Sequence, residues 1–98
     1  MHIEKQEDGT SLTVTLSGAL GAATAPELEA SLEDLGGVKE LTLDLASVEY
    51  VSSAGLRVLL LLHKKMSAQG KMKVKNASPG VMDIFKVAGF TKFLLIEQ

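Results

Sequence analysis

Three short runs of alternating polar and apolar residues constrain the fold of this chain more than any other feature. The runs are Ser11–Ser17, Lys39–Leu45 and Lys71–Lys75. Strict alternation is typical of a β-strand with one buried face, so we expect the apolar residues of each run to point inwards. Stretches with helical spacing separate the runs, as parallel strands require. The sequence therefore predicts an α/β domain with a mixed, mostly parallel sheet and helices mainly on one face.

Each end of the chain adds a strand to this sheet. Ile3 lies in a shorter run, and Asp8-Gly9 favours a tight turn that joins this run to the next. We therefore expect an antiparallel hairpin at the N-terminus. Phe93–Ile96 is an apolar run and is predicted to form the last strand. The small residues Gly18–Ala23 are predicted to form a loop.

Capping signals mark three helices. Thr24–Glu27 has the spacing of a capping box, in which Thr24 caps the first helix and Glu27 reaches back. Gly36-Gly37 is predicted to end that helix. The second helix is expected over residues 54–69 and is apolar nearly all round at its start. Ser78-Pro79 starts the third helix and Gly89 ends it.

Size and composition limit the function classes. The 98 residues are expected to form a single domain over 1–98, and a hydrophobic content of 46% is typical of globular chains. With no cysteine and only His2 and His63, we expect no disulfide, metal or cofactor. A net charge of −2 argues against direct nucleic-acid binding. The longest apolar run, Val58–Leu62, predicts no membrane insertion, and without a signal peptide we expect a cytoplasmic protein.

Two adjacent serines mark the place where a strand-like run gives way to the second helix. Ser52 and Ser53 precede Ala54 and Gly55, whose small side chains allow another surface to approach the backbone closely. A serine here can cap the helix, because its oxygen accepts a hydrogen bond from a free backbone N–H. The same position tolerates a phosphate, since helix N-termini favour anions. Residue type and spacing alone favour the cap.

Candidate catalytic groups do not converge. Asp44 is the only carboxylate placed at the end of a central strand, and it is interpreted as a turn or hydrogen-bonding residue. His63 lies on the same helix as Ser53, roughly 15 Å further along it, which excludes a serine–histidine pair. The Lys71–Lys75 run carries a lysine at every second position, which we interpret as a solvated face that discourages pairing of a sheet edge. Catalysis by this chain is therefore not expected.

Three separate segments resemble one protein family. Leu43–Leu60, which contains Ser-Ser-Ala-Gly-Leu-Arg, resembles the central signature of the STAS family, which includes bacterial anti-sigma factor antagonists and domains of sulfate transporters. Ala22–Leu28 looks like the start of the first helix of that family, and Ser78–Phe90 looks like its third helix. The order of elements matches as well, so the resemblance covers essentially the whole chain and implies a STAS-like fold.

The resemblance implies a partner-switching function. Such an antagonist binds an anti-sigma factor that is a serine kinase and frees the sigma factor; phosphorylation by the kinase ends binding and a serine phosphatase restores it. The matching glycine-leucine places the phosphorylated serine at Ser53, with Ser52 as the second candidate. Gly21 and Ser52 stand where the family often has aspartate. The partner-binding residues implied are Gly21, Thr24, Ser52, Ser53, Ala54, Gly55, Leu56 and Arg57.

Two other function classes remain open at the level of sequence. The first is a STAS adaptor subunit of a transporter or lipid-trafficking complex that is never phosphorylated, which the missing aspartates at Gly21 and Ser52 favour. The second is a small enzyme or nucleotide-binding domain. It lacks reactive residues within reach of one another, and no phosphate-binding glycine motif follows a strand.

Overall fold

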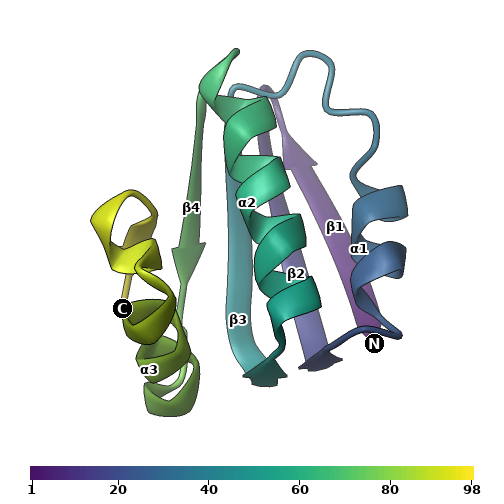
Figure 1. Cartoon of the computed structure of the whole chain (residues 1–98). Coiled ribbons are helices and arrows are strands. Elements are labelled where there is room, and N and C mark those ends of the chain that lie inside the picture. Colours follow the sequence, from purple (N-terminus) through teal and green to yellow (C-terminus); the bar gives the residue numbers. More distant parts are fainter.

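The computed structural model describes all residues from 1 to 98 and contains one five-stranded sheet. The strands lie side by side in their order along the chain, β1-β2-β3-β4-β5. Figure 1 shows the first four in this order. The first pair is antiparallel and all the others are parallel, as the sequence predicts. The strands are β1 His2–Asp8, β2 Ser11–Leu20, β3 Glu40–Val51, β4 Lys71–Lys75 and β5 Leu95–Glu97.

The helices lie on one side of the sheet, with α2 between α1 and α3 (Figure 1). The helices are α1 Ala25–Ser31, α2 Ser53–Ser67, α3 Pro79–Ala88 and a short 3-10 turn, η1 Phe90–Lys92. The other side of the sheet carries polar side chains such as Thr15 and Lys73 and has no covering layer. The predicted arrangement of helices mainly on one face is therefore confirmed. No helix is both long and apolar enough to cross a bilayer.

The core lies between the sheet and the helices. The alternating residues Leu12, Val14 and Leu16 of β2 are buried, and so are Leu41, Leu43 and Leu45 of β3. Leu59, Leu62 and Met66 of α2 and Phe85 of α3 cover them and are fully buried. Each buried side chain of this size stabilises the fold by about 1.5–3 kcal/mol relative to exposure. β2, β3 and α2 therefore supply a large part of the core.

The two central strands continue further than the alternation predicts. We expected β3 to end at Leu45, but it runs to Val51, and β2 extends to Leu20 into the predicted loop. Between the pairs Thr15–Asp44 and Leu20–Val51 the register shifts twice, and each shift adds one residue on β3. These bulges break the period of two, which places Val48 and Val51 in the core. Asp44 therefore lies inside β3 rather than beside the serine turn.

The lysines of β4 do not protect a sheet edge, so that part of the interpretation is wrong. β5 pairs with β4 and forms the edge instead. Lys73 lies 3.3 Å from a carboxylate oxygen of Glu97 and 4.0 Å from one of Glu40, and Lys71 lies 3.7 Å from Glu40. These are partly exposed pairs worth little in stability, which fits the interpretation of a solvated face.

Two element boundaries also differ from prediction. Helix α1 ends at Ser31 and not at Gly36-Gly37, although Leu32 and Leu35 remain buried in the turns that follow. The last strand is β5, Leu95–Glu97, because residues 90–92 form η1 and Leu94 packs into the core. After α1 and before β5, buried leucines lie in turns. Apolar periodicity does not distinguish such leucines from those of a helix or strand, so it predicts longer elements than the structure has.

Candidate functional site

The predicted site residues come from two segments that meet at one end of the sheet. One segment, Gly21–Thr24, follows β2, and the other, Ser52–Arg57, follows β3. The carboxyl ends of these parallel strands are adjacent, because Leu20 pairs with Val51. The backbone N–H of Ser52 donates to the carbonyl oxygen of Leu20 at 2.9 Å, which fixes one segment against the other. The topology therefore places all eight predicted residues at the same end of the sheet.

The two serines have different positions in α2. Ser52 is the N-cap: its backbone is extended, and its hydroxyl oxygen accepts a hydrogen bond from the N–H of Gly55 at 3.3 Å. Ser53 is the first residue of the helix, is exposed, and its hydroxyl has no hydrogen-bond partner in the chain. Because Ser52 already caps α2, the Ser53 hydroxyl is free for chemistry or for contact with another molecule.

We expect Ser52→Ala to lower the free energy of unfolding by about 1 kcal/mol, because the N–H of Gly55 loses its acceptor. The change is measured as a lower urea midpoint at an unchanged m-value. Ser67→Ala is the matched control at the other end of α2, where the hydroxyl donates only to the His63 carbonyl oxygen at 2.8 Å. Equal losses from the two variants would contradict the capping role of Ser52.

Gly55 brings α2 close to the sheet. A Cβ at this position would lie 2.6 Å from the carbonyl oxygen of Leu20 and 2.8 Å from its Cγ. The surface that approaches Gly55 is therefore β2 of the same chain. Gly55 is buried, so it holds the start of α2 in place and leaves Ser53, Ala54, Leu56 and Arg57 to face outwards in part or in full.

Thr24 does not form the predicted capping box. Its backbone is helical, with φ −103° and ψ −20°, and its side chain makes no cap bond to α1. The Thr24 hydroxyl instead donates to the Ala19 carbonyl oxygen at 2.7 Å and accepts from the Gly21 N–H at 2.9 Å. Glu27 points to the N-terminal amino group, 4.0 Å away. Thr24 therefore closes the loop after β2 and fixes Gly21 beside the serines.

Apolar side chains of α3 extend the exposed surface around the start of α2. Leu56 lines a shallow hollow together with Ile84, Val87 and Asp83. Val87 is 91% exposed, the largest exposure of any large hydrophobic residue in the chain. Val87 is not among the residues predicted for the site. In the sequence it is marked only as an apolar residue that lies off the buried face of α3 defined by Val81 and Phe85.

The possible catalytic groups lie apart from Ser53. His63 packs its ring on that of Phe93, with centroids 4.9 Å apart, and its Nδ1 atom is buried without a hydrogen-bond partner. One carboxylate oxygen of Asp44 accepts from the Ala46 N–H at 3.1 Å and from the Asn76 side-chain amide at 3.2 Å. The hydrogen-bonding role predicted for Asp44 is confirmed. Neither His63 nor Asp44 therefore has Ser53 as a hydrogen-bond partner.

Comparison with known proteins agrees with this geometry. Residues 3–97 match the family described as "Mlab, STAS domain". The chain belongs to the STAS family. Among its relatives, BtrV of Bordetella bronchiseptica, which is named as an anti-sigma factor antagonist, is 38% identical over 82 residues. The match covers 81% of this chain and 71% of BtrV.

Solved structures show the same STAS fold. The anti-sigma factor antagonist SpoIIAA in its unphosphorylated form has a TM-score of 0.85 at 17% identity, covering 99% of this chain and 89% of that one. SpoIIAA of Bacillus in its phosphorylated form has a TM-score of 0.77 at 16% identity, with 99% and 92% covered. A sulfate transporter family protein of Wolinella succinogenes has a TM-score of 0.80 at 15% identity, with 90% and 76% covered. At these identities the matches establish the fold.

Proposed function

We propose that this STAS domain is an anti-sigma factor antagonist. It binds an anti-sigma factor that is a serine kinase, releases the sigma factor, and loses the kinase once Ser53 is phosphorylated; a serine phosphatase then restores binding. The names of its relatives BtrV and SpoIIAA support this role. The observation that carries the proposal is Ser53 itself, an exposed first residue of a helix that Ser52 already caps.

The position of Ser53 suits a reversible modification. Phosphorylation adds about −1.5 to −2 charges and three strong acceptor oxygens. At the N-terminus of α2 these meet free backbone N–H groups and the positive end of the helix dipole, so the fold tolerates them. In an interface the same group is bulky and costly to desolvate. Modification therefore blocks binding without unfolding the domain.

The proposed contact surface surrounds this serine. Ser53, Ala54, Leu56 and Arg57 of α2 supply it, with Gly21 of the adjacent loop. Ser52, Gly55 and Thr24 hold these residues in place through the cap, the close packing on Leu20 and the loop hydrogen bonds. No aspartate is present at positions 21 and 52, so we propose that the kinase recognises the helix start itself rather than acidic side chains beside it.

The experiment that tests this function is intact-protein mass spectrometry of the chain purified from its native host, with peptide mapping of residues 46–64. We expect a phosphorylated fraction with the phosphate on Ser53, and its loss after treatment with a serine phosphatase. A phosphate on Ser52 would move the switch to the second candidate. Uniformly unmodified protein under growth, stress and stationary conditions would contradict the switch.

A second function has support from one of the structural matches. The resemblance to a sulfate transporter family protein favours a STAS adaptor that binds a transporter or lipid-trafficking complex and is not phosphorylated. The same measurement distinguishes the two functions, because an adaptor stays unmodified at Ser53 in every condition. Co-purification with membrane transporter subunits instead of a kinase would then identify it.

A further inference from the structure

Helix α2 carries positively charged side chains that form no ion pair within the chain. Its residues include Arg57, Lys64 and Lys65 and no aspartate or glutamate, although the whole chain has a net charge of −2. Arg57 and Lys64 take part in none of the ion pairs of the structure, in contrast to Lys71 and Lys73 on β4. Both side chains are exposed. The outer face of α2 is therefore a site of unpaired cations on a weakly acidic protein.

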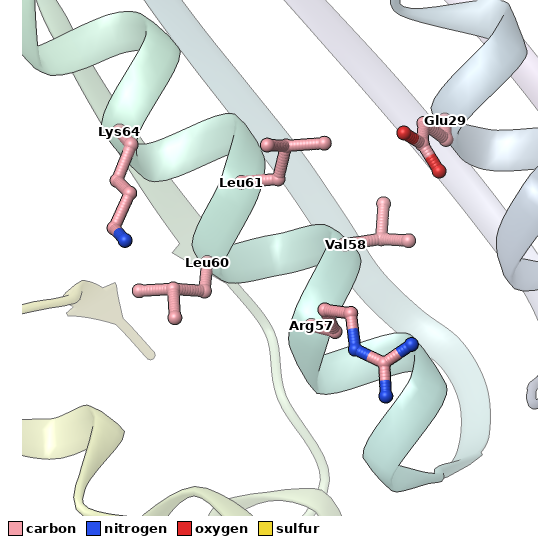
Figure 2. A pocket seen from close by; sticks show the side chains of 6 residues that line it. All are labelled: Glu29, Arg57, Val58, Leu60, Leu61 and Lys64. Atoms are coloured by element: carbon pink, nitrogen blue, oxygen red, sulfur yellow. The ribbon is translucent and has the colours of Figure 1, made fainter.

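These cations enclose apolar side chains along one line of the helix. Arg57 and Lys64 are seven residues apart, which is close to two turns, so they lie almost in line. Leu60 and Leu61 lie between them, and Leu61 is 37% exposed. We call Arg57, Leu60, Leu61 and Lys64 the α2 stripe. Figure 2 shows Leu61 extending towards α1 and Glu29, while Leu60 and Lys64 extend to the opposite side of α2. The α2 stripe and Glu29 line one shallow groove.

We propose that the α2 stripe is the docking surface for an acidic amphipathic helix of the partner protein. Apolar side chains of that helix, spaced three or four residues apart, would cover Leu60 and Leu61, and its carboxylates would pair with Arg57 and Lys64. Glu29 on the opposite wall repels carboxylates from the α1 side. The charge pattern therefore predicts that the partner helix is negatively charged and that its acidic residues lie on the side away from α1.

The stripe continues the surface around Ser53, so this inference rests on the proposed function. Ser53 is exposed and lies one turn before Arg57 on the same face of α2. A phosphate on Ser53 would add negative charge at the end of the stripe and would compete with the partner's carboxylates for Arg57. The acidic helix would then be repelled from a surface that it otherwise neutralises.

Site-specific photocrosslinking in the native host tests the proposal. A benzoylphenylalanine is placed at position 61 of the full chain, at position 22 in the loop beside Ser53, and at position 15 on the uncovered face of the sheet as an exposed control. We expect position 61 to crosslink to a helical segment of the partner that is rich in Asp and Glu and has apolar residues at helical spacing. A crosslink to a basic segment, to nucleic acid or to a second copy of this chain, or no crosslink at all, would overturn the proposal.

Affinity for a synthetic peptide of the crosslinked segment gives the quantitative test. We expect Arg57→Gln and Lys64→Gln each to weaken binding about fivefold at low salt and to reduce its salt dependence, because each removes one ion pair. Lys75→Gln makes the same change of charge on β4, whose lysines lie on the uncovered face of the sheet, and is expected to have no effect. Equal affinities for all three variants would overturn the proposal.

The two crosslinking positions separate this inference from the proposed function. Crosslinks to an anti-sigma factor kinase from position 22 but not from position 61 would leave the function intact and remove the α2 stripe from the interface. Crosslinks from position 61 to an acidic helix of a protein that is no kinase would support the stripe and refute the function.

Discussion

We expect Ser53→Asp to weaken binding to the proposed partner, an anti-sigma factor kinase, about thirtyfold or more, a loss of about 2 kcal/mol. The carboxylate stands on an exposed first residue of α2, where it must be desolvated when a partner covers it. The same charge lies at the positive end of the helix dipole, which favours an anion by about 0.3–1 kcal/mol. The variant should therefore be slightly more stable than wild type and yet bind worse.

A slightly higher free energy of unfolding together with weaker binding is the result that we expect from Ser53→Asp. Binding is followed by isothermal titration calorimetry and stability by urea unfolding of the same preparation. Ser53→Ala is the control: it removes the phosphate acceptor but adds no charge, so it should bind the kinase like wild type and resist phosphorylation. A Ser53→Asp variant that binds as tightly as wild type, or that unfolds, would contradict the switch.

A chain that carries phosphoserine at position 53 should show a larger effect than aspartate. Its charge of about −1.5 to −2 exceeds that of a carboxylate, and its three oxygens occupy more of the contact surface. Arg57, one turn along α2, has no carboxylate partner and is free to pair with it. Removal of the phosphate by a serine phosphatase should restore wild-type affinity.

The sequence predicted the layers of this fold because local pattern and tertiary burial agree in three strands. The alternating leucines of β2 and β3 are buried, as their period of two requires. Prediction failed between Ala46 and Tyr50, because the bulges of β3 become visible only when β2 is paired with it. Strand length there depends on the neighbouring strand and not on the local pattern, so the sequence placed the end of β3 six residues too early.

The candidate site was predictable only to the level of the helix start. The pattern located Ser52 and Ser53 correctly at the beginning of α2, but not which of them is the cap, because that depends on where β3 ends. Thr24 was assigned to the wrong partner, since its hydroxyl bonds back to Ala19 across the loop instead of forward into α1. Val87 lies off the buried face of α3, but its position near Leu56 depends on the arrangement of α3 beside α2, which no local pattern encodes.

The largest effect on stability is expected from Gly70→Ala, which should cost about 3 kcal/mol or more. Gly70 lies between α2 and β4, and a Cβ there would overlap the Lys39 carbonyl oxygen and come within 2.7 Å of the Lys39 carbonyl carbon. Because these are backbone atoms, no rotamer change relieves the overlap. The N–H of Lys71 donates to the same Lys39 oxygen at 2.9 Å, so moving the segments apart would break that bond.

Gly80→Ala is the matched control for this prediction. Gly80 lies in α3, and a Cβ there has no atom within 4 Å, so alanine should stabilise the protein by about 0.5–1 kcal/mol through its higher helix propensity. Urea unfolding of the two variants compares the same substitution in opposite surroundings. Gly70 is also at the far end of α2 from Ser53, so the folded fraction of Gly70→Ala should bind the partner with unchanged affinity. A stable Gly70→Ala protein would mean that α2 and Lys39 can separate, and the close approach of helix and sheet would then not be what fixes the direction of α2.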